Sequence, residues 1–297
     1  MLRIFTKSFN QIVQKPLLVF FLYAVGFVLA MLVARPFYVT FLNEANTSVA
    51  LDKLIEDFDF MIFTDFFHQS QRAFKPFVPL VFVLGLVYLL LNTFFAGGVL
   101  DATEQDKFKF PRFFEASAQH FGRFAMLLVF LFIFLMVLVS LAGMFFFIFA
   151  AIAEGGSEKD YILWMIPPVL ILVYFVGFVV ILGDYGRVML FKSQTLTPYS
   201  AFWKAFSYIF KRPTAIALFW VIIVLSIILS VVYLGIDSLI GMNSGLTIFV
   251  MFLVQQTFVF ARTFLKISTQ IAAQNYFEAR PIELEKAIVL TETEEEI

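Results

Sequence analysis

The sequence lacks cysteine altogether and contains only two histidines, His68 and His120. The absence of cysteine excludes disulfides, thiolate-bound zinc, iron–sulfur clusters and thiol nucleophiles. Two histidines are too few for a typical histidine-based metal site, and we expect both to be exposed residues at the membrane surface. The sequence therefore predicts no metal site and no bound cofactor.

Charged residues are also scarce. Asp, Glu, Lys and Arg make up 14% of the 297 residues, against roughly 25% in soluble domains. The formal net charge is −1, without the clustered basic excess of a nucleic-acid-binding protein. No glycine-rich phosphate loop, dinucleotide-binding fingerprint or H-E-x-x-H motif is present. We therefore predict that the protein binds no nucleic acid and is not an enzyme.

Apolar residues, in contrast, make up 61% of the chain, and 43 of them are phenylalanine. A single soluble core could not bury this much aromatic surface, whereas lipid solvates it directly. A membrane-spanning helix needs about 20 mostly apolar residues. Six runs meet this requirement: residues 16–38, 77–100, 124–153, 161–183, 213–236 and 246–264. The sequence predicts an all-α, polytopic transmembrane bundle of six helices in a lipid bilayer, within one membrane domain of residues 1–278.

Residues near the ends of the first and fourth spans allow further predictions. The stretch from Met1 to Lys15 is not followed by a small-residue cleavage pattern, so we expect residues 16–38 to remain as the first span. Arg35–Pro36 is expected at the outer interface, where a long arginine can reach the headgroups. Pro167–Pro168 removes backbone donors, and we expect it to kink the fourth span or to mark its outer end.

The distribution of basic residues predicts the orientation. With six spans, the N-terminus, the loops after the second and fourth spans, and the C-terminus share one side of the membrane. That side carries sixteen of the 21 Lys and Arg residues, and the opposite side carries five. Because an excess of Lys and Arg marks the cytoplasmic side, we predict a multi-pass protein of the plasma (bacterial inner) membrane with both termini in the cytoplasm.

Two segments outside the spans stand out. In the long outer segment 39–76, the residues Leu51, Leu54, Ile55 and Phe58 form the apolar stripe of a helix, which would lie on the outer membrane face or cover the bundle. Residues 279–297 end in an acidic run and are expected to form a solvated, mobile cytoplasmic tail.

Three predicted cytoplasmic segments share one pattern immediately before a span. Each is amphipathic and aromatic, and each ends in a basic residue followed by Pro or Phe: residues 5–16, 113–124 and 202–213, with Lys15, Arg123 and Arg212 as the bases. The rings suit headgroup depth, and the base would face the anionic inner surface. We predict three repeats of an interfacial helix and a transmembrane hairpin, at 1–100, 101–185 and 186–278; the alternative is that any cytoplasmic loop is basic and aromatic.

This arrangement of interfacial helix, basic residue and hairpin resembles the multi-span membrane domain found beside some bacterial glycerophosphodiester phosphodiesterases and in stand-alone relatives of that domain. The segments Gly98-Val99-Leu100-Asp101 and Gly183-Asp184-Tyr185, before the second and third interfacial segments, are similar to the junctions in those domains. The resemblance covers most of the chain and implies a membrane-embedded accessory or anchoring domain. The soluble phosphodiesterase barrel has no counterpart here, so that activity is not implied.

Few polar residues fall within the predicted spans. Asp184 and Arg187, at spacing i, i+3, can pair on one helix face, either as a proton or anion site at the cytoplasmic mouth or as a salt bridge that ends the fourth span. Gln255 and Gln256 lie near the middle of the sixth span, where an amide needs a partner. They would make interhelical hydrogen bonds or line a polar substrate path.

Two functions agree with these features. The first is a non-enzymatic scaffold, anchor or accessory subunit that binds a membrane protein partner or a second copy of itself. The second is a transporter or permease for a small or lipid-like molecule, with a path lined by Gln255, Gln256, Asp184 and Arg187.

Overall fold

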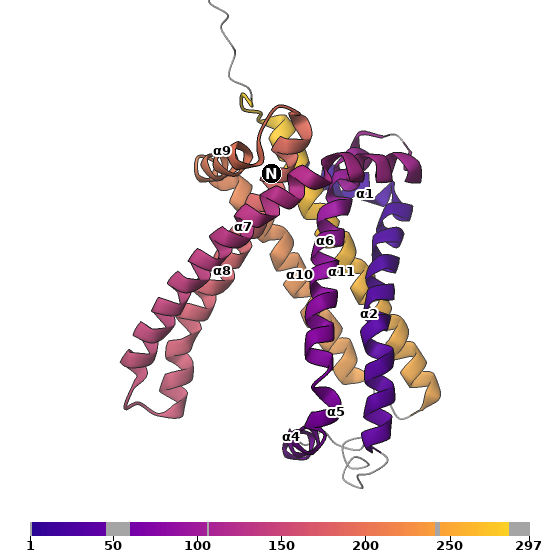
Figure 1. The fold of residues 1–297 in the computed structure, drawn as a ribbon, viewed down its shortest axis with the longest axis vertical. Coiled ribbons are helices and arrows are strands. Elements are labelled where there is room, and N and C mark those ends of the chain that lie inside the picture. Colours follow the sequence, from indigo (N-terminus) through magenta and orange to yellow (C-terminus); the bar gives the residue numbers. More distant parts are fainter. Residues whose placement is uncertain (1, 46–59, 106, 241–243, 285–297) are drawn as a thin grey trace, which may run out of the picture. The chain divides into compact units, whose positions relative to one another are not determined.

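The computed structural model describes residues 2–45, 60–105, 107–240 and 244–284 (Figure 1). Every regular element among these residues is an α-helix. Six helices are long and apolar enough to cross a membrane: α2 (Pro16–Ala45), α6 (Phe77–Glu104), α7 (Phe110–Ala153), α8 (Glu158–Lys192), α10 (Pro213–Leu239) and α11 (Gly245–Ala279). The shorter helices are α1 (Leu2–Val13), α4 (Phe60–Gln69), α5 (Gln71–Phe74) and α9 (Pro198–Phe210). The predicted all-α fold with six candidate spans is confirmed.

Proline decides which interfacial segments are separate helices. α2 begins at Pro16 and α10 at Pro213, each three residues after the end of the preceding helix, α1 or α9. Proline lacks the N–H that would continue the preceding helix and disfavours helical backbone in the residue before it; Arg212 accordingly has φ −136° and ψ 78°. Phe124 imposes no such restriction, so α7 runs unbroken for 44 residues. The second interfacial segment is therefore the beginning of α7 rather than a helix of its own.

Several helices extend beyond the apolar runs that predict them. α2 continues through Pro36 to Ala45, and α8 passes through Pro167 and Pro168 and continues to Lys192. Pro167–Pro168 therefore lies inside α8 and does not mark its outer end, which was one of the two outcomes predicted for it. α11 continues to Ala279, fifteen residues after the apolar run ends at 264. A helix satisfies its own backbone hydrogen bonds, so it can leave the bilayer intact where its side chains become polar.

Side-chain caps fix where two spans begin. Ser157 accepts a hydrogen bond from the backbone of Asp160, whose carboxylate accepts one in return from the Ser157 backbone, so α8 starts with a capping box. Ser244 and Thr247 form the same arrangement at the start of α11. Between α7 and α8 the chain turns at Gly155, whose φ of 86° is accessible mainly to glycine.

The contacts divide the chain into two compact units, residues 1–16 with 93–297 and residues 17–92. In the larger unit, the C-terminal half of α8 is buried against α7, α9, α10 and α11. A Cβ atom added at Gly186 would lie 2.9 Å from Leu127 of α7, and one at Gly183 would lie 3.0 Å from Leu131. The two glycines therefore allow α7 and α8 to approach closely. The three repeats predicted above remain a prediction.

The smaller unit contains most of α2, all of α4 and α5, and α6 as far as Asn92. Phe66 and Phe74 are buried at its centre, with Phe41, Phe67 and Phe77 packed against them. The amphipathic stripe at 51–58 lies outside the described residues.

The surface of the spans is strongly apolar. On the hairpin of α7 and α8, for example, Phe132, Phe147 and Ile162 are 55%, 81% and 65% exposed. Each such side chain would cost about 25 cal/mol per Å² of apolar surface in water, whereas lipid tails solvate it. The chain is therefore a multi-span membrane protein in contact with the lipid bilayer, and its orientation remains a prediction.

Candidate functional site

The C-terminal ends of α6, α8 and α11 meet in the larger unit. Their polar side chains form what we call the helix-end network: Thr103, Glu104, Lys192, Gln274 and Glu278. Lys192 Nζ lies 2.6 Å from Glu104 Oε1 and 2.7 Å from Glu278 Oε1, so one ammonium joins all three helix ends. The Thr103 hydroxyl donates to Gln274 Oε1 at 2.8 Å. The side chains of Lys192, Glu104 and Glu278 are 28%, 40% and 37% exposed, which places the network at the surface.

The basic residue that ends each interfacial segment binds carbonyl oxygens at the end of a span. Lys15 Nζ donates to the carbonyls of Ala102 and Gln105, the latter at 2.7 Å, at the end of α6. Arg123 donates to the carbonyls of Leu190, Ser193 and Leu196 at 3.0, 2.7 and 2.6 Å, at and beyond the end of α8. Arg212 donates to the carbonyl of Arg280, the residue that follows α11. In each case the base caps the second helix of its own hairpin.

These contacts correct the expectation that Lys15, Arg123 and Arg212 face the anionic membrane surface. The last four carbonyls of a helix have no partner within the helix, and they carry the negative end of its dipole. A cation that reaches these carbonyls donates hydrogen bonds to them and also interacts favourably with the negative end of the helix dipole. Lys15 is consequently only 7% exposed.

A polar residue also occupies a similar place near the end of each of these spans. Asp101 on α6 forms a salt bridge with Arg112, with Oδ1 3.0 Å from Nη2. Asn275 on α11 donates to Ser8 Oγ at 2.8 Å and to Gln11 Oε1 at 2.7 Å, which ties α11 to α1. The third such residue is Asp184 on α8, one of the predicted site residues.

Asp184 and Arg187 pair as their spacing predicts, with Arg187 Nη1 3.3 Å from Asp184 Oδ1. The pair does not end the helix, because α8 continues to Lys192. Asp184 is only 5% exposed, and Thr269 lines the same small cavity. A buried carboxylate is tolerated when a cation pairs with it in this way.

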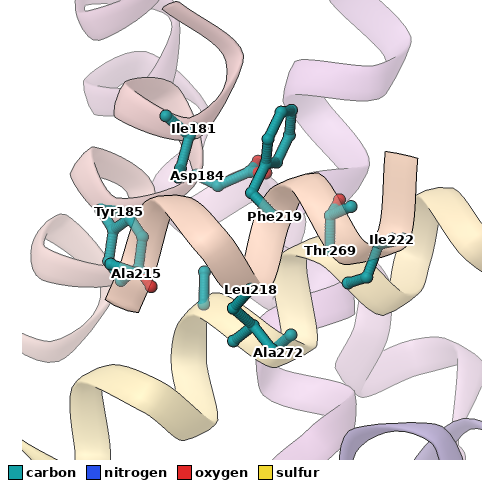
Figure 2. Close-up of a pocket in the computed structure, with 10 residues that line it drawn as sticks. Ile181, Asp184, Tyr185, Ala215, Leu218, Phe219, Ile222, Thr269 and Ala272 are labelled. Atoms are coloured by element: carbon teal, nitrogen blue, oxygen red, sulfur yellow. The ribbon is translucent and has the colours of Figure 1, made fainter. Parts of the chain in front are cut away.

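Beside Asp184 lies a small cavity lined by residues of α8, α10 and α11 (Figure 2). Figure 2 shows the Asp184 carboxyl group beside the Phe219 ring, with Thr269 on the facing helix. The cavity volume is about 10 Å³, close to the least that holds one water molecule. Most of its lining is aliphatic or aromatic, so it offers no room or chemistry for a solute larger than water.

The two glutamines predicted to share a path with Asp184 lie elsewhere. Gln255 is exposed, Gln256 is half-buried, and neither lines the cavity. Thr269, which does face Asp184, follows Gln255 by fourteen residues on the same helix, a distance of about 21 Å at 1.5 Å per residue. The structure therefore brings together Asp184 and Arg187 but separates them from Gln255.

His120 is buried rather than exposed, which corrects the sequence interpretation. It is 6% exposed, and its ring centroid lies 4.9 Å from that of Phe191 and 5.7 Å from that of Phe124. The cause is a close approach of α6 to α7: a Cβ atom added at Gly97 would lie 3.3 Å from the His120 Cβ atom. Among the described residues no three His, Asp or Glu side chains are grouped as a metal ion would require.

The beginning of the predicted mobile tail is held against α9. Lys204 donates to the carbonyls of Glu283 and Leu284, and the Tyr208 hydroxyl donates to that of Arg280 at 3.0 Å. Burial raises the pKa of the Tyr208 hydroxyl above its ordinary value, so the hydroxyl remains a donor. Residues 280–284 are thus bound to the protein; residues 285–297 lie outside the described residues.

Sequence reasoning missed Lys192, the residue that joins the three helix ends. Its partners lie 88 and 86 residues away in the chain, so no local spacing points to them. A weak signal was available in the recurrence of Asp101, Asp184 and Asn275 near the ends of alternate spans.

No protein-family model, curated protein or solved structure matches the chain. The resemblance to the membrane domain associated with glycerophosphodiester phosphodiesterases therefore remains a prediction from the sequence.

Proposed function

We propose that the chain is a non-enzymatic accessory or scaffolding protein of the plasma membrane, which holds a partner at the bilayer. The observation that carries this proposal is the use of its polar side chains. Lys192, Lys15, Arg123 and Arg212 join helix ends or cap them, and Asp184 is neutralised by Arg187 beside a cavity of about 10 Å³. These contacts join helices of the larger unit to one another.

The positions of the residues predicted to line a path argue against the alternative function, a transporter or permease. Such a path needs Gln255 and Gln256 to share a polar cavity with Asp184. The separation of about 21 Å along α11 between Gln255 and Thr269 speaks against that arrangement within the larger unit. An anchoring role also agrees with the resemblance stated above, which implies an accessory membrane domain.

The proposal is tested by photo-crosslinking in native membranes. A photoreactive residue replaces Trp203 or Phe210, which are 50% and 62% exposed on α9, and a control replaces Phe147 on α7, which is 81% exposed among apolar neighbours. We expect one protein, or a second copy of the chain, to be captured from α9 at a fixed ratio and nothing to be captured from position 147.

Two results would contradict the proposal. A chain that purifies as one monodisperse species, with no protein captured from any position, would remove the support for an accessory role. Solute flux in proteoliposomes that disappears in a Gln255→Leu, Gln256→Leu double variant would establish the transporter instead.

A further inference from the structure

The smaller unit contains a groove that the proposed function does not use. Its volume is about 860 Å³, and its walls come from α2, α4, α5 and the start of α6, within the range of small-molecule sites. Four phenylalanines line it, Phe37, Phe67, Phe74 and Phe77, and so do two cations, Arg72 and Lys75.

The phenylalanines of the aromatic wall pack against one another. The centroid of the Phe74 ring lies 5.3 Å from that of Phe37 and 4.7 Å from that of Phe67, and the centroids of Phe37 and Phe77 are 5.4 Å apart. Rings held against one another lose little side-chain freedom when an apolar chain is laid over them. This part of the groove is suited to an acyl chain.

The groove lies at the level of a membrane boundary. Val33 and Phe37, which line it, follow the start of α2 at Pro16 by 17 and 21 residues, or about 26 and 32 Å at 1.5 Å per residue. A bilayer has a hydrocarbon core of about 30 Å. The groove therefore opens at the end of the span opposite to Pro16, where tails meet headgroups.

The charges in the lining have one sign. Arg72 and Lys75 both face the groove, and among the described residues no carboxylate lines it and no salt bridge joins either cation to a carboxylate. Guanidinium pairs with phosphate through two parallel hydrogen bonds, and lysine adds a point charge. A free phosphate would leave the apolar wall uncovered, whereas a phospholipid covers the wall with its tail and meets the cations with its headgroup.

From this juxtaposition of aromatic wall, paired cations and membrane depth, we propose that the groove binds an anionic phospholipid. The headgroup phosphate is held by Arg72 and Lys75, and an acyl chain lies along the phenylalanines. A headgroup with net negative charge is preferred to a zwitterionic one, because the described lining holds two cations and no carboxylate that would offset them.

The test compares lipids on the purified full chain. The protein is reconstituted with phosphatidylglycerol or phosphatidylcholine, and the lipid retained is measured by native mass spectrometry. We expect phosphatidylglycerol to be preferred by about tenfold or more, given the attraction of each basic residue for an anionic headgroup. An Arg72→Gln, Lys75→Gln variant should lose the preference, and a Lys107→Gln, Lys109→Gln variant, with the same change of charge at exposed positions, should keep it.

A second pair of variants tests the apolar wall. Val81 and Val83 on α6 are both 53% exposed, but only Val81 lines the groove. Val81→Trp should fill the groove and reduce retention of either lipid, whereas Val83→Trp should leave retention unchanged. Equal retention of both lipids by the unsubstituted chain, or an unchanged preference in the Arg72→Gln, Lys75→Gln variant, would overturn the proposal. So would competition by millimolar inorganic phosphate as effective as that by the lipid, which would indicate a site for a small anion.

Discussion

Replacement of Arg123 by methionine removes a cation from the contact between α7 and the end of α8 while keeping an apolar side chain of similar length. The guanidinium makes three charge-assisted hydrogen bonds, to the carbonyls of Leu190, Ser193 and Leu196. These three residues are 0%, 5% and 7% exposed, so water reaches their carbonyls poorly.

The expected cost follows from those contacts. A buried acceptor left without its donor costs about 1–3 kcal/mol. The summed cost of three such carbonyls is an upper limit, because the loop after α8 can relax and expose some of them to water. We therefore expect the free energy of unfolding to fall by about 3 kcal/mol. Arg123→Lys should cost about half as much, because an ammonium cannot reproduce the fork of the guanidinium.

The assay is reversible unfolding in mixed micelles, followed by circular dichroism, together with limited proteolysis of the loop at 193–197. Lys109→Met is the matched control, since Lys109 is exposed just before the same helix and should change stability by no more than about 0.5 kcal/mol. The reasoning is refuted if Arg123→Met is no more destabilising than Lys109→Met and the loop is cleaved no faster.

Three further substitutions test neighbouring contacts by the same unfolding measurement. Lys192→Met should lower the free energy of unfolding by about 1 kcal/mol, because its two salt bridges are partly exposed. The difference from the unsubstituted chain should shrink at high salt, and a difference independent of salt would contradict this. Gly98→Ala should cost about 1–3 kcal/mol, since the new Cβ would lie 2.5 Å from a phenylalanine ring, whereas Gly143→Ala meets nothing within 4 Å and should not destabilise. Arg187→Met should cost about 3–5 kcal/mol by leaving a buried carboxylate unpaired, and adding Asp184→Asn should restore part of the loss; additive effects would argue against the pair.

The sequence predicts where the spans begin better than it predicts where the helices end. Pro16 and Pro213 begin their spans where expected, because proline both favours the first helical turn and breaks the helix before it. The ends of α8 and α11 lie well beyond the apolar runs. Hydropathy reports only the part of a helix inside the bilayer, so it cannot locate the end of a helix that continues into water.

In the candidate site, the sequence predicts contacts within one helix but not contacts between helices. The pairing of Asp184 with Arg187 follows from the i, i+3 spacing on one helix. The contacts of Arg123 and Lys192 depend on how separate hairpins pack, and their partners are remote in the chain. A basic residue near a membrane surface has two uses, at the headgroups or at the end of a neighbouring helix. Only the packing decides between them.

The central claim is that the polar side chains of the larger unit join helices and do not line a water-filled path. Because the chain contains no cysteine, single cysteines can be introduced without other changes. Ile222→Cys, Thr269→Cys and Ala272→Cys, at positions that line the cavity beside Asp184, are treated in native membranes with a membrane-impermeant thiol reagent. Lys109→Cys and Glu154→Cys serve as exposed controls, which should react from opposite sides of the membrane. The account predicts that only the two controls react; reaction at the three cavity positions together with Gln255→Cys would contradict it.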